Sequence, residues 1–254
     1  MKRPILFFAV LGLLGSSTQA QAAFLINDGG FEVNPLLNWK VVNQAGSDGT
    51  WFFNDNLSGS PVTGLTVPLP PQGLIAAMTD QEGPGSHVLY QDFVVPMGVS
   101  SATLSFKRYI QNTASGFFNG TQGLDYTGAA NQQARADIML ASANPFSTAS
   151  GDVLQNVFRT NSGDLRESGY STVTANLTAL LASRGGQTLR LRFAEVDNQI
   201  DSNFLFGVDD ISLSATSNAP PNPVPAPAGL LLVATGLPLL VGMLRRRATL
   251  AVAS

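Results

Sequence analysis

Cysteine is absent from the 254 residues, and histidine occurs only once, as His87. A disulfide framework, thiolate metal ligands and a cysteine nucleophile are therefore excluded, and one chain cannot build a zinc site from two or three histidines. Charge is also scarce, because Asp, Glu, Lys and Arg make up 12% of the chain, about half of the ~25% in an ordinary soluble protein. With a formal net charge of −3 and no basic patch in its body, the chain does not have the composition of a nucleic-acid binder.

The N-terminal segment has the three parts of a secretory signal peptide. Lys2 and Arg3 precede an uninterrupted apolar run over residues 5–14, and Ala20-Gln21-Ala22 supplies a small-residue cleavage site. The pattern predicts a signal peptide over residues 1–22 and a mature chain that begins at Ala23 or Phe24. A short buried helix is the alternative, since ten apolar residues are too few to span a bilayer.

The C-terminal segment reads as a linker, a membrane span and a basic stop. Residues 218–227 are rich in proline and should be extended, and residues 228–244 carry no charge. Arginines at 245–247 follow, so we predict a transmembrane helix with its stop over residues 228–247 and a cytoplasmic tail over 248–254. This orientation places the body outside the membrane, in agreement with the signal peptide.

The same tail resembles the PEP-CTERM sorting signal of Gram-negative bacteria. The resemblance covers about the last 35 residues and rests on three ordered pieces: the proline motif Val224-Pro225-Ala226-Pro227, the Leu/Gly-rich segment, and Arg245-Arg246-Arg247. The usual motif has Glu between the two prolines, where this chain has Ala226. The resemblance implies processing by an exosortase, a membrane peptidase, in a bacterium that makes exopolysaccharide. A plain C-terminal membrane anchor is the alternative.

The body, residues 23–217, contains short β-type runs separated by Gly, Asn, Asp and Ser clusters, with no internal repeat. Strands are predicted at residues 88–95, 102–110, 134–140, 153–158, 188–194 and 204–213, and a short helix at 174–183. In residues 188–194, apolar Leu189, Leu191 and Phe193 alternate with Arg190 and Arg192, which is typical of a half-buried antiparallel strand. We therefore predict one all-β domain, an antiparallel β-sandwich of the jelly-roll type. Its net charge is about −8, because all 17 acidic residues lie within it.

Two segments at the ends of the body resemble the first and last strands of the galactose-binding-like jelly roll found in many carbohydrate-binding modules. They are Asn27-Asp28-Gly29-Gly30-Phe31-Glu32, followed by Trp39 in a core position, and Phe206-Gly207-Val208-Asp209-Asp210. The resemblance implies that the two segments lie side by side and hold a structural calcium ion. Glu32, Asp209 or Asp210, and a glycine carbonyl such as that of Gly30 are the implied ligands, and oxygen ligands of this kind suit Ca²⁺. A solvated turn without a metal is the alternative.

Aromatic side chains in polar loops are candidate platforms for a sugar ring, which needs an exposed plane and polar groups beside it. We select Trp51, Phe53, Phe118 and Tyr126 as ligand-binding candidates, and core packing is the alternative for each. Acid pairs such as Glu195 with Asp197, or Asp209 with Asp210, are the only sign of glycoside hydrolysis, and no G-x-S-x-G elbow or phosphate loop is present.

We therefore expect a non-enzymatic exported protein of the bacterial cell surface or extracellular matrix, with exopolysaccharide as its expected partner. A structural or adhesive protein without a glycan ligand, and a polysaccharide-acting enzyme, are the competing classes.

Overall fold

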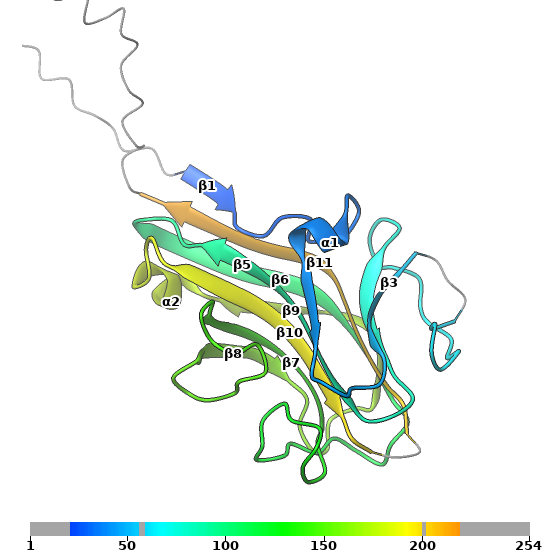
Figure 1. Cartoon of the computed structure of the whole chain (residues 1–254). Coiled ribbons are helices and arrows are strands. Elements are labelled where there is room, and N and C mark those ends of the chain that lie inside the picture. The colour runs from blue at the N-terminus through cyan, green and yellow to red at the C-terminus, as the bar shows by residue number, and fades with distance from the viewer. Residues whose placement is uncertain (1–20, 56–58, 200–201, 219–254) are drawn as a thin grey trace, which may run out of the picture. The chain divides into compact units, whose positions relative to one another are not determined.

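Two antiparallel β-sheets packed face to face make up the computed structural model, which describes residues 21–55, 59–199 and 202–218 (Figure 1). Sheet A has the order β3 (Thr50–Asn54), β4 (Ala76–Asp80), β11 (Phe204–Ser217), β6 (Val99–Asn112) and β9 (Glu167–Asn176), and β1 (Gln21–Phe24) also pairs with β11. Sheet B has the order β2 (Lys40–Asn43), β5 (Gly85–Val94), β10 (Thr188–Asp197), β7 (Gln132–Leu140) and β8 (Val153–Arg159). The predicted β-sandwich is therefore confirmed.

All six predicted strands are present, as β5, β6, β7, β8, β10 and β11. The predicted helix over 174–183 is wrong at its start, because residues up to Asn176 belong to β9 and the helix α2 covers only Thr178–Ala182. Val173 and Ala175 point their side chains into the core, so strand alternation overrides the weak local helix signal. The other helix, α1 (Pro35–Asn38), is a single turn between β1 and β2.

Aromatic rings from both sheets meet in the centre of the sandwich. Phe193 of β10 lies 5.0 Å from the ring of Phe106 on β6 and 6.5 Å from that of Phe206 on β11. Trp39 closes one end of this cluster at 6.0 Å from Phe193, and it is buried as expected. Burying one such ring contributes about 1.5–3 kcal/mol, so this cluster is a main source of cohesion between the sheets.

The first and last strands lie side by side although they are distant in sequence (Figure 1). Gln21 pairs with Ser217 and Phe24 with Ser214 in the β1–β11 ladder. β1 thus includes Gln21 and Ala22, which the predicted cleavage site assigns to the signal peptide. Cleavage after Ala22 would leave half of this short strand.

The remaining terminal predictions fall outside the described residues. These include most of the signal peptide, the proline motif, the transmembrane helix and the arginine stop. Within the part of the chain that the structure describes, no helix is both long and apolar enough to cross a membrane.

Candidate functional site

The outer face of sheet B is covered by two long loops, residues 113–131 between β6 and β7 and residues 141–152 between β7 and β8. Leu124 of the first loop packs against Val88, Ala194 and Val196 on the sheet. The guanidinium of Arg192 donates hydrogen bonds to the carbonyls of Pro145 and Ser147 in the second loop. β10 is therefore buried on both faces rather than on one, because loops that are remote in sequence cover its second face.

Buried ion pairs hold the second loop against the sheet. Asp137 of β7 accepts hydrogen bonds from Arg135 and Arg192, and both Asp137 and Arg192 are fully buried. Burial alone would raise the pKa of Asp137, but the bonds and charges of the two arginines outweigh it and hold that pKa below the usual value. Arg190 pairs in the same way with Asp92 and donates to the carbonyls of Ala141 and Ala143.

A hollow of about 400 Å³ lies between the two loops, and we name it the loop hollow. It is lined by Gln44, Gln122, Asp125, Asn144, Phe146, Ser147 and Asp152. No cationic side chain lines it, so its charge comes from two carboxylates.

The polar groups of the loop hollow are only partly used by the protein. Asp125 accepts three hydrogen bonds at Oδ1, from Gln44 and Thr127, and these bonds lower its pKa. Its Oδ2, like Oδ1 of Asp152, has no protein donor among the described residues. Phe146 lines the hollow, so a partly exposed ring stands beside free hydrogen-bond acceptors. Tyr126 does not line it, but it packs against the same apolar cluster as Phe146 and its backbone amide donates to Gln44, which does line it.

The four predicted sugar platforms do not come together. Trp51 is 4% exposed and packs edge-on against Phe206, so it is a core residue and not a platform. Phe53 packs on Phe31 with ring centres 5.7 Å apart and also belongs to the core. Phe118 is half-buried and pairs with Gln132 through an isolated bridge. Tyr126 does not line the loop hollow, but its backbone amide donates to Gln44, which does. The sequence analysis missed Phe146 and the amides beside it, since nothing local marks two loops that converge.

The predicted calcium residues do lie together, where the first and last segments meet. A Cβ placed on Gly30 would lie 4.0 Å from Oδ1 of Asp209 and 3.7 Å from Cγ of Glu32. Asp28, Phe31 and Asp210, the three non-glycine residues with positive φ in the described chain, are all in these two segments. Such backbone strain is concentrated at functional sites in many proteins.

Both carboxylates already bind backbone groups of one loop. Glu32 Oε1 accepts hydrogen bonds from the amides of Leu74 and Ile75, and Asp209 Oδ2 accepts one from Gln72. Burial and the charges of Asp210 and Glu32 raise the pKa of Asp209 to about 7, although the amides of Asp210 and Gln72 oppose this. In the described part of the chain, no three His, Asp or Glu side chains are arranged as a complete metal-binding group.

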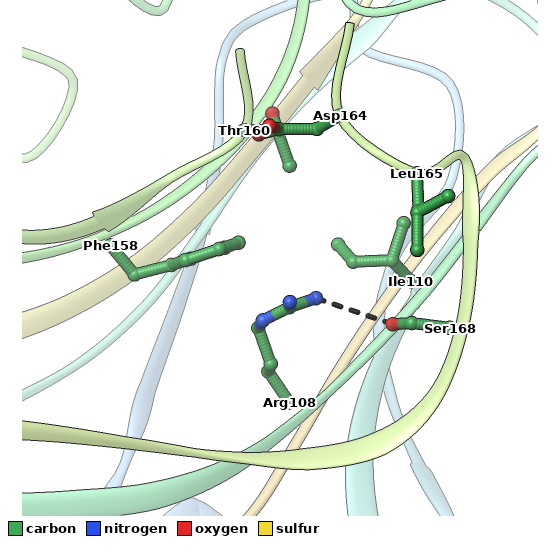
Figure 2. Close-up of a pocket in the computed structure, with 7 residues that line it drawn as sticks. All are labelled: Arg108, Ile110, Phe158, Thr160, Asp164, Leu165 and Ser168. Atoms are coloured by element: carbon green, nitrogen blue, oxygen red, sulfur yellow. Dashed lines mark hydrogen bonds between the residues drawn. The ribbon is translucent and has the colours of Figure 1, made fainter.

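A second cavity, of about 270 Å³, opens at the sandwich edge formed by β8 and β9 (Figure 2). We name it the edge cavity, and it is lined by Arg108, Ile110, Phe158, Thr160, Asp164, Leu165 and Ser168. Figure 2 shows Arg108 and Ser168 on one side of the space and Thr160 and Asp164 on the other, with apolar Phe158, Ile110 and Leu165 between them.

The acid pair Glu195 and Asp197 is not placed for hydrolysis of a polymer. Both residues point between the sheets, at 0% and 1% exposure, and neither lines the loop hollow or the edge cavity. Asp209 is equally buried, so the alternative acid pair also lacks access to a substrate chain.

Comparisons with known proteins give structural similarity only. No protein-family model matches the chain, and no curated protein matches it. The carbohydrate-binding module TmCBM61, solved with β-1,4-galactotriose, is 11% identical, with a TM-score of 0.44 and coverage of 75% of this chain and 97% of that one. The K3 cleaved adhesin domain of Lys-gingipain from Porphyromonas gingivalis W83 is 14% identical, with a TM-score of 0.44 and coverage of 76% and 99%.

The CBM22-2 xylan-binding domain from Paenibacillus barcinonensis Xyn10C is 16% identical, with a TM-score of 0.38 and coverage of 74% and 97%. At these scores the similarities assign no function to this chain.

Proposed function

We propose that this chain is a non-enzymatic glycan-binding protein that contacts neutral polysaccharide through the loop hollow. The observation that carries the proposal is the chemistry of this hollow: unpaired carboxylate oxygens of Asp125 and Asp152 beside the ring of Phe146. Sugar hydroxyls donate hydrogen bonds to such acceptors, and the C–H face of a pyranose packs on an aromatic ring. Because the lining includes acids and no cation, a neutral sugar suits it better than an anionic one.

The rigid support of the hollow favours binding over mere loop packing. The 141–152 loop is fixed by hydrogen bonds from Arg190 and Arg192, so a ligand meets a preformed surface. Preformed surfaces lose less conformational entropy on binding.

Binding of the full-length protein to galactan and xylan, measured by affinity electrophoresis and calorimetry, tests the proposal. Phe146→Ala and Asp125→Asn should each weaken binding about 10-fold, or roughly 1.4 kcal/mol. Glu82→Gln, at an exposed acid outside both cavities, is the control and should bind as the native chain does. Equal affinity in all four proteins, or no binding to any neutral polysaccharide, would contradict it.

The setting of this function is proposed from the terminal segments. We propose export by the signal peptide, sorting by an exosortase through Val224-Pro225-Ala226-Pro227 and Arg245-Arg246-Arg247, and a final location at the cell surface or in the extracellular matrix. Exopolysaccharide is then the polysaccharide that we propose as the partner at this location. Replacing the three arginines with serine should leave export intact and abolish the mass shift between precursor and processed chain.

We further propose a structural calcium ion beside Asp209. The proximity of Glu32 and Asp209 at Gly30, the burial of Asp209 and the strained backbone around it support the proposal. Calcium at 100-fold over its Kd would add about 2.7 kcal/mol to the free energy of unfolding. Asp209→Asn should remove this gain and Glu82→Gln should keep it. A native chain whose unfolding midpoint is the same in calcium and in EDTA would contradict the site.

A further inference from the structure

Arg108 in the edge cavity has no ion-pair partner among the described residues, unlike the buried arginines of this protein. Arg135, Arg190 and Arg192 each form an ion pair with an aspartate, and these are the ion pairs of the described residues. Arg108 is half-buried, yet its one hydrogen bond is from Nη1 to Oγ of Ser168, at 3.2 Å. Four of its five N–H groups therefore have no acceptor among the described residues.

The position of Arg108 in its strand is equally unusual. Phe106, Arg108 and Ile110 alternate along β6 on the face that looks into the sandwich, and Val208, a core residue, pairs with Arg108 across the sheet. The guanidinium stacks on Phe158 with its carbon 4.8 Å from the ring centre. Loss of solvent lowers the pKa of Arg108, and the nearby charge of Asp164 only opposes this without forming an ion pair. A half-buried guanidinium with free donors is a site for a carboxylate.

We propose that the edge cavity binds an acidic sugar, a hexuronate residue of a polysaccharide, with its carboxylate on Arg108. This inference rests on the proposed glycan-binding function, but its residues are separate from those of the loop hollow. The volume of about 270 Å³ suits a single sugar ring. The carboxylate accepts from the guanidinium and Ser168, the ring lies between Phe158 and Leu165, and hydroxyls at the far end donate to Asp164 (Figure 2).

The charge distribution of the described residues supports an anionic ligand at this edge. Arg159 and Arg166 flank in sequence the loop that closes the cavity, although neither side chain lines it, and with Arg108 they are three of the six basic residues outside ion pairs in the described chain. Two acids, Asp164 and Glu167, lie beside them, which leaves a local positive excess on a body that is otherwise acidic. A polyanion would therefore approach the protein at the edge cavity.

The test compares one polymer in two charge states. Binding of the full-length protein to polygalacturonate, and to the same polymer with its carboxyl groups reduced to alcohols, is measured by calorimetry in EDTA, so that no cation bridges acids. The native protein should prefer the carboxylated form at least 10-fold. Arg108→Met keeps the length and apolar stem of the side chain and should abolish the preference while the thermal midpoint stays near the native one.

Two further variants distinguish the site from a general charge effect. Arg108→Lys keeps the charge but loses the planar fork, so it should retain only part of the preference. Arg184→Met removes a half-buried arginine outside the cavity and should retain all of it. Equal affinity of the native protein for both polymers, or a preference that survives in Arg108→Met, would overturn the inference. Retained binding to neutral galactan or xylan in that case leaves the proposed function standing, whereas loss of all glycan binding removes both.

Discussion

His87 of β5 lies directly opposite Glu195 of β10 in the interior of the sandwich. Both side chains are fully buried, and Nε2 of His87 and both carboxylate oxygens of Glu195 lack a hydrogen-bond partner among the described residues. Nδ1 of His87 contacts Oδ1 of Asn43 at 2.9 Å. Burial lowers the pKa of His87 to about 4 and raises that of Glu195 well above its usual value, so both groups are neutral near pH 5.

Glu195 should make the domain less stable as the pH rises. A carboxyl whose pKa is raised by folding stabilises the fold below its unfolded pKa of about 4.5, and this contribution is lost as the pH rises through the folded pKa. The free energy of unfolding of Glu195→Gln, measured in urea, should therefore fall less steeply than that of the native protein as the pH rises above about 4.5. Glu82→Gln should show the native pH dependence. Parallel curves for Glu195→Gln and the native chain would contradict this assignment.

Asp197 should also make the domain less stable as the pH rises. Its pKa is raised to about 6 by burial, from 3.8, so its contribution is complete below pH 4 and lost between about pH 4 and 6. In Asp197→Asn, the free energy of unfolding measured in urea should change less with pH in this window. Its pH dependence above pH 7 should equal that of the native chain. His87 acts in the opposite direction, because its neutral form stabilises the fold above pH 6.5 and this is lost as the pH falls toward 4.

Asp137 should be essential for the fixed position of the 141–152 loop. Asp137→Ala leaves the buried guanidiniums of Arg135 and Arg192 without a counter-charge, which costs about 3–5 kcal/mol in similar sites. Amide hydrogen exchange should then rise in residues 141–152 more than in β6 or β11. Asp164→Asn, at an exposed acid, is the control and should change neither the stability nor the amide exchange of residues 141–152. If this loop stayed protected from exchange in Asp137→Ala, the proposed role of Asp137 would be wrong.

Gly29 and Gly30 should differ sharply in their tolerance of alanine. A Cβ on Gly29 would lie 1.8 Å from the carbonyl oxygen of Ile211, whereas one on Gly30 meets its nearest atom at 3.7 Å. Gly29→Ala should cost about 2 kcal/mol or more in urea unfolding, since the clash is with backbone. Gly30→Ala should stay within about 0.5 kcal/mol. Similar costs for the two variants would show that the segments approach less closely than described.

Trp51 should matter for stability but not for glycan binding. Trp51→Phe removes part of a buried ring that packs on Phe206 and should cost about 1–3 kcal/mol. Its affinity for galactan should equal that of the native chain, in contrast to Phe146→Ala. If Trp51→Phe lost as much affinity for galactan as Phe146→Ala, Trp51 would have to be assigned to the binding surface.

The amino-acid sequence was sufficient to predict the all-β class, the six principal strands, the core position of Trp39 and the meeting of the first and last segments. The all-β class and the six strands follow from period-two alternation and from local turn residues, which are properties of neighbouring positions. The core position of Trp39 and the meeting of the two end segments were implied only by the resemblance to the galactose-binding-like jelly roll. Alternation also placed Arg190 and Arg192 on the face opposite Leu189 and Leu191.

Which segments cover each face of a strand depends on the tertiary structure. Alternation tells which side chains share a side of a strand, but loops that are remote in sequence bury Arg192 against Pro145 and join Asp125 to Phe146 in one hollow. The same holds for Trp51, whose polar neighbours in the sequence suggested exposure while its strand faces Phe206. Arg108 was not selected from the sequence, because its lack of an ion partner depends on which acids the fold brings near. Among the described residues the fold brings none within ion-pair distance.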